Sequence, residues 1–146
     1  MATIAQSVTV SRPSAASAFP IVLLGRVLFA LIFLMTIFNH FSSQTIAYAA
    51  SQGVPLASLI VPLSGIIAVL GGLSIVLGYH AKFGAWMIVL FLIAVTPMHK
   101  FWGVSDPMMR QMQLVMFLKN LSMLGGALLI TQLGAGPWSI DHRSGR

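Results

Sequence analysis

Four long apolar segments are the feature that most limits what this chain of 146 residues can fold into. They cover residues 19–41, 57–79, 81–99 and 112–133. A helix needs about 20 apolar residues to cross the roughly 30 Å of hydrocarbon in a bilayer, and each segment is near that length. Because every backbone polar group must be satisfied inside the bilayer, each segment is expected to be a helix. The sequence therefore predicts an all-α integral membrane protein, an antiparallel bundle of four helices.

The composition agrees with this class of protein and excludes several others. The chain is 58% hydrophobic and only 7% charged, whereas a soluble domain carries about 25% charged residues. It has no cysteine, which excludes disulfides, thiolate metal sites and iron–sulfur clusters. The net charge of +6 comes from scattered basic residues and does not indicate nucleic acid. The expected partners are the lipid bilayer and other membrane-protein subunits.

The distribution of basic residues predicts how the chain is oriented. Residues 1–18 are predicted to form a disordered cytoplasmic tail, and residues 134–146 a cytoplasmic C-terminal tail. With the N-terminus inside, the outer side carries only Lys100 and Arg110, and the inner side carries Arg12, Arg26, Lys82, Arg143 and Arg146. By the positive-inside rule, this places both termini in the cytoplasm. The charge-free loop 42–56 is expected to lie against the membrane surface.

Lys119 lies inside the fourth apolar segment. A cation near the centre of a membrane helix costs about 2.5–3.5 kcal/mol, so it needs a partner, a route to the interface or a function. The chain has only two acids, Asp106 and Asp141, so partners are few. Two interpretations are open for Lys119: internal pairing or extension to the interface, and a ligand site.

Other polar residues are predicted to lie near Lys119, in the outer half of the bundle. They are Asn39, His40, His99, Trp102 and Asn120. Imidazole, ammonium and amide groups together could bind the carbonyl oxygens of a quinone or hold an anion, and they could equally form a polar contact between helices. No catalytic set and no metal-ligand spacing is present. These residues favour no cofactor with certainty, and a quinone is preferred to a haem or a copper ion as the possible one.

A second polar contact is predicted at the inner side. Arg26 lies near the inner end of the first segment, and Asp141 follows the fourth. The predicted topology brings both to the cytoplasmic interface, where they are expected to form a structural ion pair. Binding of Arg26 to lipid phosphate is the main alternative.

Several short motifs resemble those of the DoxX family of small bacterial membrane proteins. They are Gly25–Leu34, Leu70–Gly78, His99–Trp102, Phe117–Gly126 and Gly134–Asp141. The resemblance implies a four-helix bundle in a bacterial inner membrane. It also implies a link to thiosulfate:quinone oxidoreduction or to oxidative-stress complexes. The chain departs from the family pattern at Ala68, where members often have a glutamate, and at Thr36–His40.

The leading functional hypothesis from the sequence is non-catalytic. It is an accessory subunit or assembly factor that packs against a larger membrane complex, of a redox or energy-converting kind. The alternative is a quinone-interacting subunit of an oxidoreductase, with Lys119, His99 and His40 around the quinone. Transport of a small anion, with Lys119 as the counter-charge, ranks third because the broken helices and repeats of transporters are not evident.

Overall fold

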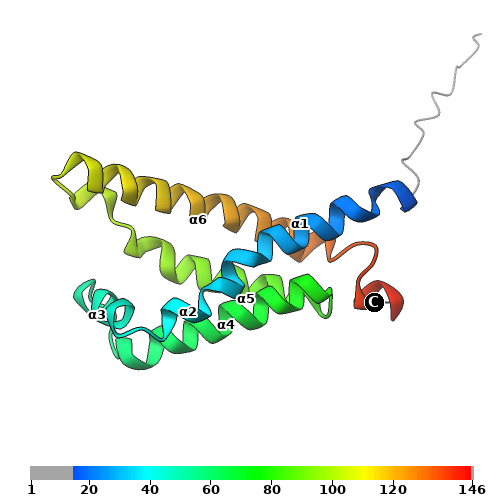
Figure 1. Ribbon diagram of the computed structural model, residues 1–146, viewed down its shortest axis with the longest axis horizontal. Coiled ribbons are helices and arrows are strands. Elements are labelled where there is room, and N and C mark those ends of the chain that lie inside the picture. The colour runs from blue at the N-terminus through cyan, green and yellow to red at the C-terminus, as the bar shows by residue number, and fades with distance from the viewer. Residues whose placement is uncertain (1–14, 146) are drawn as a thin grey trace, which may run out of the picture.

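The computed structural model describes residues 15–145, and throughout that range its regular structure is helical (Figure 1). Helices make up 81% of it. Four of them are long and apolar enough to cross a membrane. The predicted all-α membrane fold is therefore confirmed. The tail predicted for residues 1–18 lies mostly outside the described residues, and the first helix begins at Ala15.

The four long helices are α1 (Ala15–Met35), α4 (Ala57–Leu77), α5 (Ala81–Val95) and α6 (Pro107–Leu133). The short pieces are α2 (Ile37–His40), α3 (Ser43–Ser51), the 3₁₀ turns η1 (Thr96–Met98) and η2 (Phe101–Gly103), and α7 (Ile140–Arg143). Helix α6 begins at Pro107, before the expected start near Met112. The cause is local, because Asp106 accepts a hydrogen bond from the Met109 amide at 2.7 Å and proline suits a first helical position.

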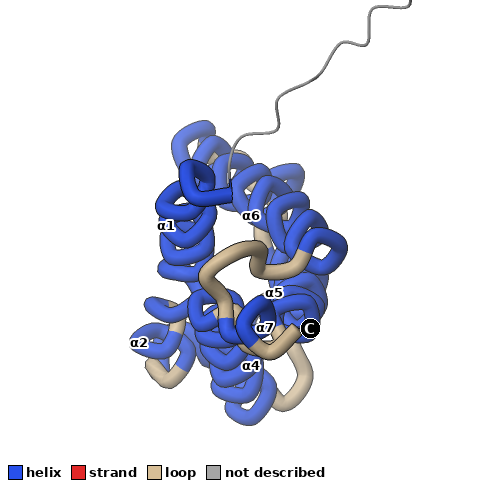
Figure 2. The backbone as a smooth tube through the Cα atoms, turned by 90° about the vertical axis from the view of Figure 1, so that its right-hand side faces the viewer, coloured by secondary structure: helices blue, strands red, loops and turns tan. Residues whose placement is uncertain are grey.

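The helices pack in the order in which the chain makes them. Helix α1 packs on α4, α4 on α5, and α5 on α6. In contrast, α1 and α6 have at most a few points of close backbone approach. Figure 1 shows the start of α1 and the C-terminus at the same end of the bundle. Figure 2 looks onto that end, where the segment after α6 passes across the ends of the helices.

Small residues bring α4 and α5 into backbone contact. A Cβ atom on Gly71 would lie 2.9 Å from the Gly84 carbonyl oxygen, and a Cβ on Gly84 would lie 3.0 Å from that of Gly71. Close approach of this kind drives helix association in a membrane, where lipid is as apolar as the side chains. The core around this contact includes Ala30, Phe33, Ala68, Ile75, Ile88, Leu92 and Ala127.

The charge-free first loop folds onto one end of the bundle. Ser42 starts α3 by accepting a hydrogen bond from the Thr45 amide at 3.2 Å. Ala49 of α3 is buried against Ala57 and Val61 of α4, and Ile46, Val54 and Met98 pack around them. At the end opposite the termini, α3 therefore covers the start of α4.

Candidate functional site

Residues 134–143, here named the strap, fold back from the end of α6. Gly134 and Gly136 have φ values of +74° and +69°. This conformation is readily available only to residues without a Cβ. Trp138 also has a positive φ of 59°. Two bends and a strained tryptophan thus direct the strap across the ends of α4 and α5.

Asp141 fixes the strap to the turn between α4 and α5. Its carboxylate accepts hydrogen bonds from the backbone amides of His80 and Ala81, each at 2.9 Å. Its own amide donates to the Gly78 carbonyl at 2.8 Å. These amides precede and begin α5, where a helix lacks internal partners for its N–H groups. Asp141 therefore supplies, from far along the chain, the cap that α5 does not have locally.

Arg26 fixes the strap from the side of α1. Its Nη2 donates to the Trp138 carbonyl at 2.9 Å, and the residue is only 5% exposed. Its Nε and Nη1 are buried and have no hydrogen-bond partner in the described part of the chain. Arg26 and Asp141 both reach Gly78, since a Cβ on Gly78 would lie 2.5 Å from Nη1 of Arg26. The direct ion pair between them remains a prediction.

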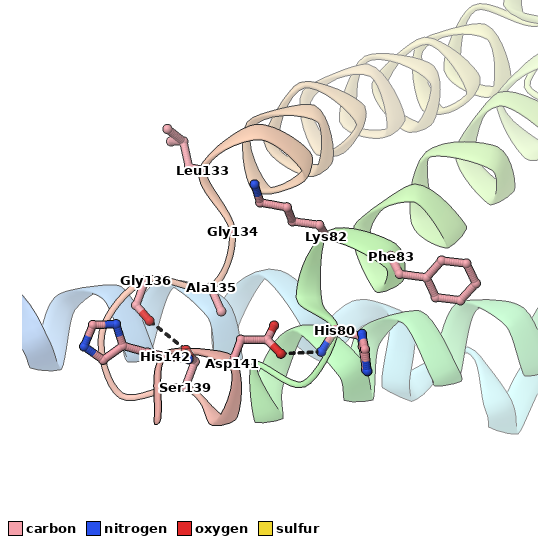
Figure 3. A pocket seen from close by; sticks show the side chains of 10 residues that line it. All are labelled: His80, Lys82, Phe83, Leu133, Gly134, Ala135, Gly136, Ser139, Asp141 and His142. Atoms are coloured by element: carbon pink, nitrogen blue, oxygen red, sulfur yellow. Dashed lines mark hydrogen bonds between the residues drawn. The ribbon is translucent and has the colours of Figure 1, made fainter. Parts of the chain in front are cut away.

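A pocket of about 460 Å³ lies between the strap, the start of α5 and the end of α6. Figure 3 shows Lys82 reaching from α5 towards Gly134, with Asp141 and His142 on the opposite wall. The remaining lining residues are His80, Phe83, Leu133, Ala135, Gly136 and Ser139. Sequence reasoning did not identify this pocket. The only signals for it were Lys82 directly after a very short turn and the Gly-Ala-Gly that follows α6.

The histidines predicted at the other end have separate partners. His99 Nδ1 lies 2.9 Å from Gln113 Oε1, and Gln113 donates to the Tyr48 hydroxyl at 3.4 Å. His40 Nδ1 lies 3.0 Å from the carbonyl of Thr36 in the preceding turn, and its ring lies 5.8 Å from that of Phe91. The partners Gln113 and Tyr48 were not predicted, because nothing in the sequence shows which residue faces His99.

The other predicted members have different surroundings. Asn39 is exposed, and Trp102 packs edge-on against Phe101 and Phe117. Lys119 is half-buried, and Asn120 is buried on the face of α6 that also carries Ala127. Among residues 15–145, no group of three metal-binding side chains comes together. A quinone or anion site formed by these residues remains a prediction.

The expected membership of the DoxX family is wrong. The family model that matches is that of the SURF4 family, over residues 8–146. The motifs misled because glycine runs such as Leu70–Gly78 meet a general demand of packed membrane helices, as Gly71 does against Gly84. The bacterial inner membrane was implied only by the DoxX resemblance and loses that support. Comparisons with curated proteins and with solved structures give no match.

The family match extends over nearly the whole chain, from residue 8 to residue 146. It fits the four membrane-spanning helices, since the family is one of multi-pass membrane proteins. The chain therefore belongs to the SURF4 family.

Proposed function

We propose that this protein is a non-catalytic membrane subunit that packs, through α1 and α6, against a transmembrane helix of a larger complex. The supporting observation is an unclosed edge of the bundle. In the most apolar stretch of each span, 17% of the residues are buried inside the chain in Ile21–His40 and in Pro107–Leu133, against 33% in Ala57–Leu77 and 39% in Ala81–Gly103. The first and last spans thus have fewer residues buried by the rest of the chain than the two middle spans, which leaves more of them to lipid or to a partner.

Two glycines mark where a partner helix would fit. A Cβ on Gly126 would lie 2.9 Å from the Phe29 ring, so this is where α1 and α6 meet. Gly25 lies one turn before Phe29, and Gly125 is next to Gly126. A Cβ added to Gly25 or to Gly125 would have no other part of the described chain within 4 Å. We name these four residues the α1–α6 seam.

Packing within the described chain does not explain why Gly25 and Gly125 are glycines. A glycine inside a helix is less favourable than alanine by about 0.5–1 kcal/mol. Internal packing does explain Gly65, Gly71 and Gly84, because a Cβ at any of them would lie less than 3.0 Å from another atom of the chain. Gly25 and Gly125 have no such neighbour among the described residues. Close approach of another helix is what small residues permit in a membrane.

The quinone-facing alternative has less support. It needs His40, His99 and Lys119 around one head group, whereas His99 is bonded to Gln113 and His40 to Thr36. The family match adds no redox role. Anion transport through Lys119 has no separate observation in its favour.

The packing proposal is tested by isolating the intact protein from its native membranes in mild detergent. Gly25→Leu and Gly125→Leu fill the seam, whereas Leu90→Phe enlarges a side chain that is 64% exposed on α5. We expect co-purifying membrane proteins to be lost from both glycine variants and kept by the α5 control. Co-purification that is equal in all three, with all three folded, contradicts the proposal. Self-association alone also contradicts it.

We also propose that both termini face the cytoplasm. Three basic residues lie towards the end of the bundle that holds the strap: Arg26, Lys82 and Arg143. At the opposite end, Lys100 follows α5 and Arg110 lies in the first turn of α6. The chain has no cysteine, so single cysteines can report topology directly. A membrane-impermeant maleimide should label Ser105→Cys in intact cells, and Ser144→Cys only after the membrane is opened. The reverse pattern refutes this orientation.

A further inference from the structure

The pocket beside the strap lies where membrane-spanning helices end, which is the depth expected of lipid headgroups. It is formed where α4 and α6 end and α5 begins, so it is at the end of three membrane-spanning helices. Four aromatic side chains at this end of the molecule are largely exposed: Tyr79, Phe83, Trp86 and Trp138. Amphipathic aromatic rings are enriched at the membrane–water interface. The pocket therefore opens at the interface and not in the hydrocarbon.

The side chains of the pocket favour an anion. Lys82 and His142 bring basic groups to its two walls, as Figure 3 shows. Asp141 is the only acid among the lining residues. Both oxygens of its carboxylate accept hydrogen bonds from backbone amides, of His80 and of Ala81, which offset its negative charge. The carboxylate is thus already engaged by the backbone, and Lys82 is the charged group of the lining that can meet an anion.

The guanidinium of Arg26 adds a fixed positive charge close to the same wall. Ser139 lines the pocket, and a Cβ on Gly78 would contact both Ser139 and Nη1 of Arg26. Buried donors without a partner, such as Nε and Nη1 of Arg26 in the described structure, are rare in proteins and call for an explanation, such as an ion or water. An anion in the pocket would be attracted by this guanidinium, although Arg26 is not itself among the lining residues.

We propose that this pocket binds a phosphate-bearing anion, and that its source is the headgroup of an anionic phospholipid. The volume of about 460 Å³ lies within the range of about 300–1,000 Å³ that is typical of small-molecule sites. Lys82 is the main contact, because it is the one lysine or arginine among the lining residues. The exposed rings of this end would flank the acyl chains next to the headgroup; they are those of Tyr79, Phe83, Trp86 and Trp138.

The test uses the full chain in nanodiscs of phosphatidylcholine, with and without phosphatidylglycerol. Lipid retained after transfer to detergent is measured by native mass spectrometry. We expect wild type to retain phosphatidylglycerol in preference to phosphatidylcholine. Lys82→Gln should weaken this retention about fivefold, the ratio that corresponds to about 1 kcal/mol per cation near an anionic surface. Lys82→Arg, which keeps the charge, should retain the lipid and also shows that position 82 tolerates substitution.

Lys100→Gln is the matched control, because Lys100 is an exposed lysine outside the pocket and beyond the other end of α5. An equal loss in Lys100→Gln and Lys82→Gln would mean diffuse surface attraction and would overturn the proposal. Equal retention of the two lipids by wild type would also overturn it, unless inorganic phosphate stabilises the protein in phosphatidylcholine. That last result supports the phosphate chemistry and rejects the lipid as its source.

Discussion

The Asp141 carboxylate holds the strap to the start of α5, so its removal is expected to lower the stability of the fold more than the loss of an ordinary helix cap. In Asp141→Ala, the amides of His80 and Ala81 lose acceptors that lie 2.9 Å away. A hydrogen bond to a charged group contributes about 1.5–3 kcal/mol. The bond to His80 is exposed, so water replaces much of it, whereas the bond to Ala81 is partly buried. We therefore expect a loss of about 2–3 kcal/mol in the free energy of unfolding.

Asp106→Ala is the matched control, since Asp106 is the only other acid in the chain. Its carboxylate accepts a hydrogen bond from the Met109 amide, three residues along the chain in the first turn of α6. The loss of such a local cap costs about 1 kcal/mol. Reversible unfolding in mixed detergent micelles, followed by circular dichroism, measures both variants. If Asp141→Ala lowers the free energy of unfolding no more than Asp106→Ala does, the proposed role of Asp141 in holding the strap to α5 is refuted.

Three further substitutions test other parts of the structure by the same unfolding assay. Gly78→Ala should destabilise by more than about 1 kcal/mol, because Gly78 has a φ of +62° and its Cβ would meet Ser139 and Arg26; an unchanged midpoint would contradict the packing of the strap. Gly125→Ala should stabilise the isolated chain by about 0.5–1 kcal/mol, since nothing in the described structure lies near its Cβ position; destabilisation would show an internal contact there. Ala68→Glu should prevent folding in detergent or cost at least about 3 kcal/mol, because Ala68 is fully buried in the core and a carboxylate there would lack a partner; a well-folded variant would refute the packing of α4.

The membrane fold could be predicted because the bilayer leaves few alternatives. Segments as apolar as residues 57–79 and 81–99 must be helices, and the short turn between them makes α4 and α5 antiparallel neighbours. The start of α6 was less predictable. Pro107, Met108 and Met109 continue the helix beyond the apolar segment because Asp106 caps it. A hydropathy pattern does not show which residue caps the N-terminus of a helix, so it placed the start of α6 too late.

The strap could not be predicted, because its contacts join residues that are distant in sequence and use backbone atoms. Arg26 and Trp138 are 112 positions apart, and Arg26 bonds to a carbonyl that every residue possesses. The Asp141 carboxylate likewise accepts hydrogen bonds from backbone amides, of His80 and Ala81. Sequence patterns identify charged side chains, and so a charged partner was expected for Arg26.

The polar residues predicted around Lys119 show a different limit of prediction from sequence. Sequence gives the depth of a side chain in the bilayer but not its direction around the helix axis. His40 and His99 were expected at similar depth, yet His40 bonds to the turn just before it and His99 turns to Gln113. Helix rotation is set by packing, here by the close contact of His40 with Gly65.

Site-specific photocrosslinking in native membranes tests the proposed packing against a partner helix most directly. A photoreactive residue is placed at Gly125, in the α1–α6 seam, and for comparison at Leu90, which faces outward on α5. We expect a discrete product with another membrane protein from position 125 and none from position 90. Crosslinks from position 125 to lipid alone, or to a second copy of this chain, would contradict the packing proposal.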